Sequence, residues 1–198
     1  MEDEIRVAAF QSLIAMFISP NEEIYEMFRQ KGKKTLKQLI GSIDDEKEFY
    51  INHLYDAEIC DINNSLISAS LGERYMRANM CALNMTDLFS YFASDELRND
   101  YSFKQEMIMK NPICSYGMAM NNLLNEKLFL IAYKLLVLEG IDPNELISLL
   151  DPSFKGTAVK ILLGLKKSEI KKVDKDLDLL ESIEESVLIL ENKSMSSK

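Results

Sequence analysis

The chain contains no tryptophan, one histidine (His53), four prolines and seven glycines in 198 residues. Neither a second histidine nor a Glu-x-x-His pair accompanies His53, and metal or proton-transfer sites usually need such partners. The glycine motifs of phosphate loops, dinucleotide-binding folds and nucleophile elbows are absent as well. These absences predict a protein that is not an enzyme and that uses no cofactor or metal.

One acidic pattern superficially resembles a calcium-binding loop. Asp174, Asp176 and Asp178 alternate along the chain, but Leu179 stands where the loop would need a glycine for its sharp turn. Alternate positions on a helix point in different directions, so three such carboxylates cannot converge on one cation. We therefore predict a solvated helix face here.

Cysteine is scarce, and long apolar runs are missing. Cys60, Cys81 and Cys114 show no CxxC or Cys/His spacing, which favours buried free thiols in a reducing cytoplasm. The most apolar run, 128–138, is too short for an ordinary membrane span and contains Lys134. Residues 2–4 are acidic (Glu2-Asp3-Glu4), whereas a secretory signal begins with positive charge. We expect a cytoplasmic protein that does not enter membranes.

Acidic residues outnumber basic ones by 32 to 23, which gives a net charge of −9. That charge disfavours broad nonspecific attraction to nucleic acid or anionic membranes. A hydrophobic content of 47% is enough for a large core. We predict one helical domain over residues 1–191, followed by a disordered polar tail at 192–198.

Every proline follows a residue that can cap a helix. The four pairs are Ser19-Pro20, Asn111-Pro112, Asp142-Pro143 and Asp151-Pro152. Proline suits the first helical position, and the preceding side chain can accept a bond from the unpaired amides inside the helix. No segment has a convincing strand pattern. The sequence therefore predicts an all-α fold, a compact bundle of roughly nine helices.

Capping residues also predict where single helices begin and end. Asn125 can open a helix over 126–139, which Gly140 closes, with Ile141 able to supply a Schellman-type contact. Further candidate caps are Thr86, Ser94 and Ser102.

Two helices are predicted near the C-terminus. Thr157 opens a short one through Leu165, and a long amphipathic one spans about 168–190. The apolar positions of the long helix recur in steps of three and four: Ile170, Val173, Leu177, Leu180, Ile183, Val187 and Leu190. Such a face can pack on the body of the protein or on another chain. Leu177, Leu180 and Val187 are the candidate residues for a contact with another chain, including a homodimer.

Seven of the eleven methionines lie in the middle of the chain: Met76, Met80, Met85, Met107, Met109, Met118 and Met120. Methionine is flexible and polarisable, so such a cluster can line a groove that accepts a peptide or partner helix. Ordinary core filling is the alternative interpretation, and exposure distinguishes the two. Met80, Met107 and Met118 are the candidate groove residues.

Two lysine-rich groups stand out against the acidic background. The candidate anion-binding residues are Lys31, Lys33, Lys34 and Lys37 in one group, and Lys166, Lys167, Lys171 and Lys172 in the other. If the fold joined the groups, they could form a local strip that binds phosphate or nucleic acid. The alternative is that these lysines decorate exposed helix faces and pair with nearby carboxylates.

The residues from Glu4-Ile5-Arg6 through Phe17-Ile18-Ser19-Pro20 resemble the first helices of TorD-type chaperones of molybdoenzyme maturation. That resemblance implies an all-helical cytoplasmic protein of similar size. It covers residues 4–20 alone, and the later Asp-His pattern of the family is absent because His53 follows Asn52. We therefore transfer no binding residue and assign no family.

Together these patterns favour a non-enzymatic helical interaction protein. We expect an adaptor, regulator or specific chaperone that binds another protein or peptide through an apolar groove. The alternative function is a nucleic-acid-associated regulator that uses the two lysine groups and whose binding weakens steeply with salt.

Overall fold

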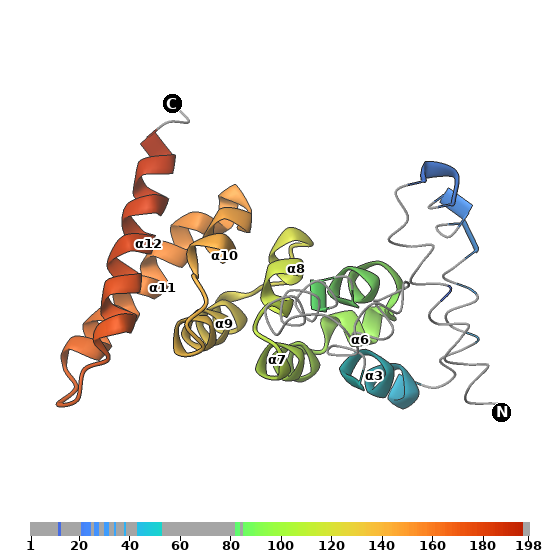
Figure 1. The fold of residues 1–198 in the computed structure, drawn as a ribbon, viewed down its shortest axis with the longest axis horizontal. Helices are drawn as coiled ribbons and strands as arrows, with labels where there is room; N and C mark the ends of the chain where they lie inside the picture. The colour runs from blue at the N-terminus through green and yellow to red at the C-terminus, as the bar shows by residue number, and fades with distance from the viewer. Residues whose placement is uncertain are drawn as a thin grey trace, which may run out of the picture. The chain divides into compact units, whose positions relative to one another are not determined.

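The computed structural model describes residues 43–52, 82–83 and 85–195, together with scattered positions between 12 and 38. This part of the chain is mostly helical and contains no strand, which confirms the all-α prediction (Figure 1). The helices with defined bounds are α3 (Ile43–Asn52), α6 (Asp95–Asn99), α7 (Tyr101–Lys110), α8 (Cys114–Met120), α9 (Glu126–Leu138), α10 (Asn144–Leu149), α11 (Pro152–Ile170) and α12 (Leu177–Met195). The chain divides into two compact units, residues 1–103 and 104–198.

The first unit is organised around aromatic side chains. The Tyr50 ring of α3 meets the Phe89 ring edge-on at 5.3 Å, and Phe89 lies 5.8 Å from Phe103. All three side chains are buried. Such edge-to-face contacts stabilise a core beyond the simple removal of apolar area from water.

Polar contacts hold α3 against the residues around α6. Glu46 accepts a hydrogen bond from the backbone N–H of Ser94 at 3.0 Å, and the Lys47 ammonium lies 2.9 Å from the Asp100 carboxylate. These contacts join residues about fifty positions apart in sequence. They fix the long-range pairing that local capping cannot specify.

The second unit packs around α9. This helix contacts α8, α11 and α12, and α10 contacts α8 and α12. The Phe129 ring of α9 meets Phe154 of α11 edge-on at 5.7 Å. The segment that forms α9 is the most apolar of the sequence because other helices pack against it on several sides.

The capping predictions for α9 and α11 are confirmed. Asn125 accepts a hydrogen bond from the Leu128 N–H at 3.0 Å, and Asp151 accepts one from the Ser153 N–H at 2.8 Å. Gly140 has a φ of 69°, and the Ile141 N–H donates to the Leu136 carbonyl at 2.8 Å. This is the Schellman geometry expected at the end of α9.

At two other proline pairs, the residue before the proline accepts its hydrogen bond in the turn that precedes the helix, and not at the first residue of the helix. Asn111 accepts from the Ile113 N–H, and Asp142 accepts from the Asn144 N–H. The prolines thus lie in the turns that lead into α8 and α10. The pair at Ser19-Pro20 lies outside the described residues.

Three further capping predictions have mixed outcomes. Ser94 caps α6 by accepting from the Leu97 N–H, as expected. Ser102 does not cap α7; Asp100 does, through the Phe103 N–H. The Thr86 hydroxyl donates to the carbonyl of the residue four positions earlier, so Thr86 lies inside a helix and does not begin one.

The two predicted C-terminal helices have the wrong boundaries. The start at Asp151-Pro152 is as predicted, but α11 runs without a break from Pro152 to Ile170, so no separate short helix opens at Thr157 or ends at Leu165. A turn occupies 171–176, and α12 extends from Leu177 to Met195, beyond the point where a polar tail was expected. Asp174 and Asp176 therefore lie in the turn and not on a helix face, which corrects that prediction. Asp176 begins α12 by accepting from the Leu179 N–H at 2.9 Å.

A buried polar chain connects three helices of the second unit. The Tyr133 hydroxyl of α9 lies 3.0 Å from the Ser186 hydroxyl of α12, which donates to the Asn144 side chain of α10 at 2.8 Å. Tyr133 and Ser186 are fully buried. Burial raises the pKa of Tyr133 to about 12, which keeps the phenol neutral and able to share this hydrogen bond.

Replacing tyrosine by phenylalanine should affect the free energy of unfolding differently at the two buried positions 133 and 50. Tyr133→Phe removes a buried hydrogen bond and should lower the free energy of unfolding by about 1 kcal/mol. The Tyr50 hydroxyl is buried without a hydrogen-bond partner among the described residues, so Tyr50→Phe should leave stability unchanged or raise it. Urea unfolding of both variants measures the contrast. Equal losses at the two positions would contradict these assignments.

Candidate protein-interaction site

The C-terminal helices form a hairpin whose outer side carries a candidate interaction site. Helices α11 and α12 lie side by side and are joined by the turn at 171–176 (Figure 1). The Lys166 ammonium of α11 lies 2.7 Å from the Glu184 carboxylate of α12. Positions 166 and 184 therefore face each other across the seam between the two helices.

Apolar residues surround this ion pair on both helices. On α11, Leu163 and Ile170 lie three residues before and four residues after Lys166, so they share its side of the helix. They are 39% and 48% exposed. Leucine and isoleucine at such positions leave apolar surface in water.

The same spacing applies on α12, measured from Glu184. Leu177 and Leu180 precede it by seven and four residues, and Val187 and Leu188 follow it by three and four. Leu177 is 72% exposed and Leu188 is 58% exposed, whereas Leu180 and Val187 are half-buried. We name the six apolar residues the hairpin face: Leu163, Ile170, Leu177, Leu180, Val187 and Leu188.

A different set of residues packs the hairpin onto its own unit. The buried positions of α11 are Ala158, Leu162, Leu165 and Glu169, and those of α12 are Leu179, Ile183, Ser186 and Leu190. These positions repeat in steps of three and four, as a core-facing stripe should. The core of the second unit is therefore satisfied without the hairpin face, whose apolar surface needs another explanation.

Charge is divided between the two helices. Between its ends, α11 carries four lysines and one glutamate, whereas α12 carries five acidic residues and one lysine. The hairpin from Pro152 to Met195 contains equal numbers of basic and acidic residues, although the whole chain has a net charge of −9. The hairpin face thus has a basic edge along α11 and an acidic edge along α12.

The turn that makes the hairpin is closed by Glu169. One carboxylate oxygen accepts from the Asp176 N–H at 3.1 Å, and the other lies 2.6 Å from the Lys172 ammonium. Glu169 is only 1% exposed. The hydrogen bond from Lys172, and then the one from the Asp176 backbone, lower the pKa of Glu169, so the ionised carboxylate is the form that holds the turn.

The methionine predictions fall on residues with little or no surface. Met107 and Met118 are fully buried, as the core-filling interpretation requires, and Met80 lies outside the described residues. Met107 and Met118 therefore do not line an open groove in this structure. Met109 and Met120 are the exposed members of the cluster, at 62% and 48%.

The lysines of the hairpin are partly engaged. Lys166 and Lys172 pair with the carboxylates described above, whereas Lys167 and Lys171 are exposed. A lysine that is already paired contributes less to binding an external phosphate, because the internal pair must first be broken. The predicted anion-binding role of this group remains a prediction.

The other lysine group belongs to the first unit. Lys31 and Lys34 are exposed, and Lys33 and Lys37 lie outside the described residues. Nucleic-acid binding through both groups together also remains a prediction.

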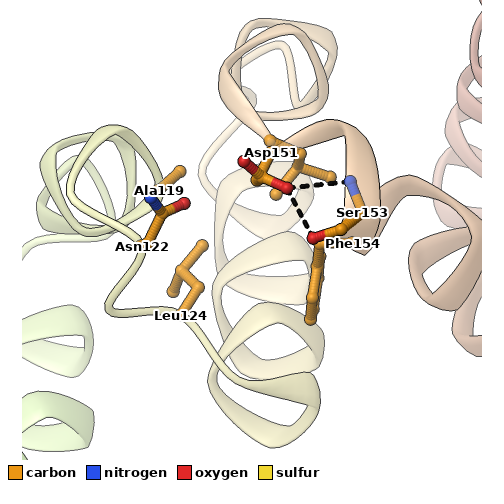
Figure 2. A pocket seen from close by; sticks show the side chains of 7 residues that line it. Ala119, Asn122, Leu124, Asp151, Ser153 and Phe154 are labelled. Carbon is orange, nitrogen blue, oxygen red and sulfur yellow. Dashed lines mark hydrogen bonds between the residues drawn. The ribbon is translucent and has the colours of Figure 1, made fainter.

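A hollow of about 330 Å³ lies beside the start of α11 (Figure 2). Its lining consists of Ala119, Asn122, Leu124, Leu150, Asp151, Ser153 and Phe154. Asp151 uses one carboxylate oxygen to accept from both the N–H and the hydroxyl of Ser153, and these bonds lower its pKa. Asn122, with a φ of 55°, ends α8 in a second Schellman turn, through the Leu123 N–H bond to the Met118 carbonyl. The polar groups of this hollow thus serve helix ends.

Comparisons with known proteins do not assign a function. No protein-family model matches the chain, and no curated protein or solved structure matches it either. Among the described residues, no group of three histidine, cysteine or acidic side chains is placed to hold a metal ion. None of the helices in the described part is long and apolar enough to cross a membrane.

The Glu169 contact predicts how acid affects the hairpin. The pKa of Glu169 is lowered in the folded protein from its ordinary value of 4.5, so its stabilising effect is present above that pH and is lost as pH falls through the folded-state pKa. Glu169→Gln should be less stable than the wild type at pH 7, and the difference should shrink below about pH 4.5. Urea unfolding at several pH values measures it. A difference independent of pH would contradict a role for the ionised carboxylate.

Proposed function

We propose that this chain is a non-enzymatic protein-interaction module, an adaptor, regulator or specific chaperone, whose docking surface is the hairpin face. The carrying observation is that apolar side chains on two adjacent helices stay exposed although the hairpin already has a complete inward-facing stripe. Leu177 and Leu188 are the most exposed members of the surface.

Covering these apolar side chains with a partner would stabilise the complex. Burying one leucine completely stabilises a complex by about 1.5–3 kcal/mol relative to leaving it in water. Exposed apolar residues scattered singly need no explanation, but contiguous ones mark interaction sites. Leu163, Ile170, Leu177 and Leu188 are contiguous because all lie within two turns of the Lys166–Glu184 pair.

The charges beside the hairpin face favour one orientation of a bound partner over others. A partner must place acidic groups near the α11 edge and basic groups near the α12 edge, so its orientation is restricted. The hairpin face differs from the methionine groove expected from the sequence, because Met107 and Met118 have no exposed surface. It retains Leu177, Leu180 and Val187, which the sequence also indicated.

Site-specific photo-crosslinking in the cells that naturally make the protein tests this proposal. A benzophenone amino acid at position 188, on the hairpin face, should give discrete protein adducts. The matched position is 138 on α9, where the leucine is 78% exposed and lies outside the hairpin face. Adducts should be absent at position 138, because no docking surface is proposed there.

Leu177→Asp supplies the second control. Position 177 precedes position 188 by eleven residues, about three helical turns, and so lies on the same side of α12. A charge there should abolish the adducts without altering the helix content. Position 188 giving no adduct, or the same adducts as position 138, would show that the hairpin face is not a docking surface.

A further inference from the structure

We infer that the hairpin face binds a second copy of this chain, so that two hairpins form an antiparallel four-helix bundle. This inference rests on the proposed docking surface and names its occupant. In the bundle, α11 of one protomer packs on α12 of its partner, and the two-fold axis runs parallel to the helices.

The charge distribution selects this symmetry. Because α11 is basic and α12 is acidic, a two-fold axis parallel to the helices places the basic edge of one copy over the acidic edge of the other, twice. The alternative two-fold axis also lies in the plane between the two hairpins but runs perpendicular to the helices. It would stack α11 on α11 and α12 on α12, with like charges opposed. Only the parallel axis is favourable.

The local charge balance favours self-association. A chain with a net charge of −9 repels its own copies over most of its surface, but the hairpin contains equal numbers of acidic and basic residues. A partner of one dominant sign would be attracted by one edge of the hairpin face and repelled by the other. A second hairpin matches both edges at once.

The register follows from the Lys166–Glu184 pair. In an antiparallel hairpin, positions before 166 lie opposite positions after 184, so Leu163 is level with Val187, and Ile170 is level with Leu180. The axis preserves these levels in the partner. Two apolar layers would therefore close above and below a central layer made of two Lys166–Glu184 pairs.

The outer edges supply a charge pair between protomers. Lys167 lies beside Lys166 on the edge of α11 away from α12, and Glu181 lies one turn before Glu184 on the outer edge of α12. Both are exposed. Within one chain they occupy opposite edges of the hairpin, but the proposed axis brings Lys167 of each protomer over position 181 of the other.

Sedimentation equilibrium of the full-length protein tests the inference directly. The wild type should sediment with twice the mass of one chain at micromolar concentration. Leu188→Asp should weaken the dimer by about a hundredfold, because an unpaired carboxylate would enter the apolar layer. Leu138→Asp is the matched control: Leu138 is 78% exposed on α9, outside the hairpin face, and its replacement should leave the dimer intact.

A charge exchange tests the symmetry. Lys167→Glu should weaken the dimer by about tenfold, because it opposes like charges at two symmetric positions. Adding Glu181→Lys to the same chain should restore association, which a structural effect within one chain would not do. Far-UV circular dichroism of each variant verifies that its helices remain folded.

The outcomes separate this inference from the proposed function. A monomeric wild type, or a dimer that resists Leu188→Asp, overturns the homodimer. If position 188 nevertheless crosslinks to a different protein, the docking surface stands and its occupant is another protein. If position 188 yields no adduct and the chain is monomeric, both proposals fail.

Discussion

The Glu169 carboxylate holds the contact on which the rest of the C-terminal architecture depends. It accepts the Asp176 N–H and pairs with Lys172, and so closes the turn between α11 and α12. Because the chain reverses at this point, two amphipathic helices lie antiparallel and place their outer apolar residues on one surface. Without the reversal, the same residues would lie along one long helix as a narrow stripe.

Each helix of the hairpin has two distinct faces, and they have different uses. The inward stripe includes Ile183 and Ser186, and Ser186 joins Tyr133 and Asn144 in the buried polar chain. That chain fixes α12 relative to α9 and α10, because a slipped helix would leave buried hydroxyl groups unpaired. A rigidly held outer face loses little conformational entropy on binding, which favours its use as a docking surface.

The sequence predicts the helix ends well wherever one side chain bonds to a nearby amide. The caps at Asn125 and Asp151 and the glycine turn at Gly140 are local, and they are confirmed. The break between α11 and α12 was missed because Val173 continues the apolar spacing through the turn, although its side chain is 99% exposed. No glycine or proline marks the break; it depends on a bond between residues seven positions apart.

The candidate site likewise combines features that follow from local sequence spacing with features that depend on contacts between distant residues. Periodicity identified Leu177, Leu180 and Val187, but Leu163 joins them only through tertiary packing, and the burial of Met107 cannot be read from spacing.

The most direct test of the central claim is hydroxyl-radical footprinting of the full-length protein in its native cells. The account predicts that Leu177 and Leu188 are protected, whereas Leu138, similarly exposed in a single chain, is labelled. Equal labelling of all three would contradict it.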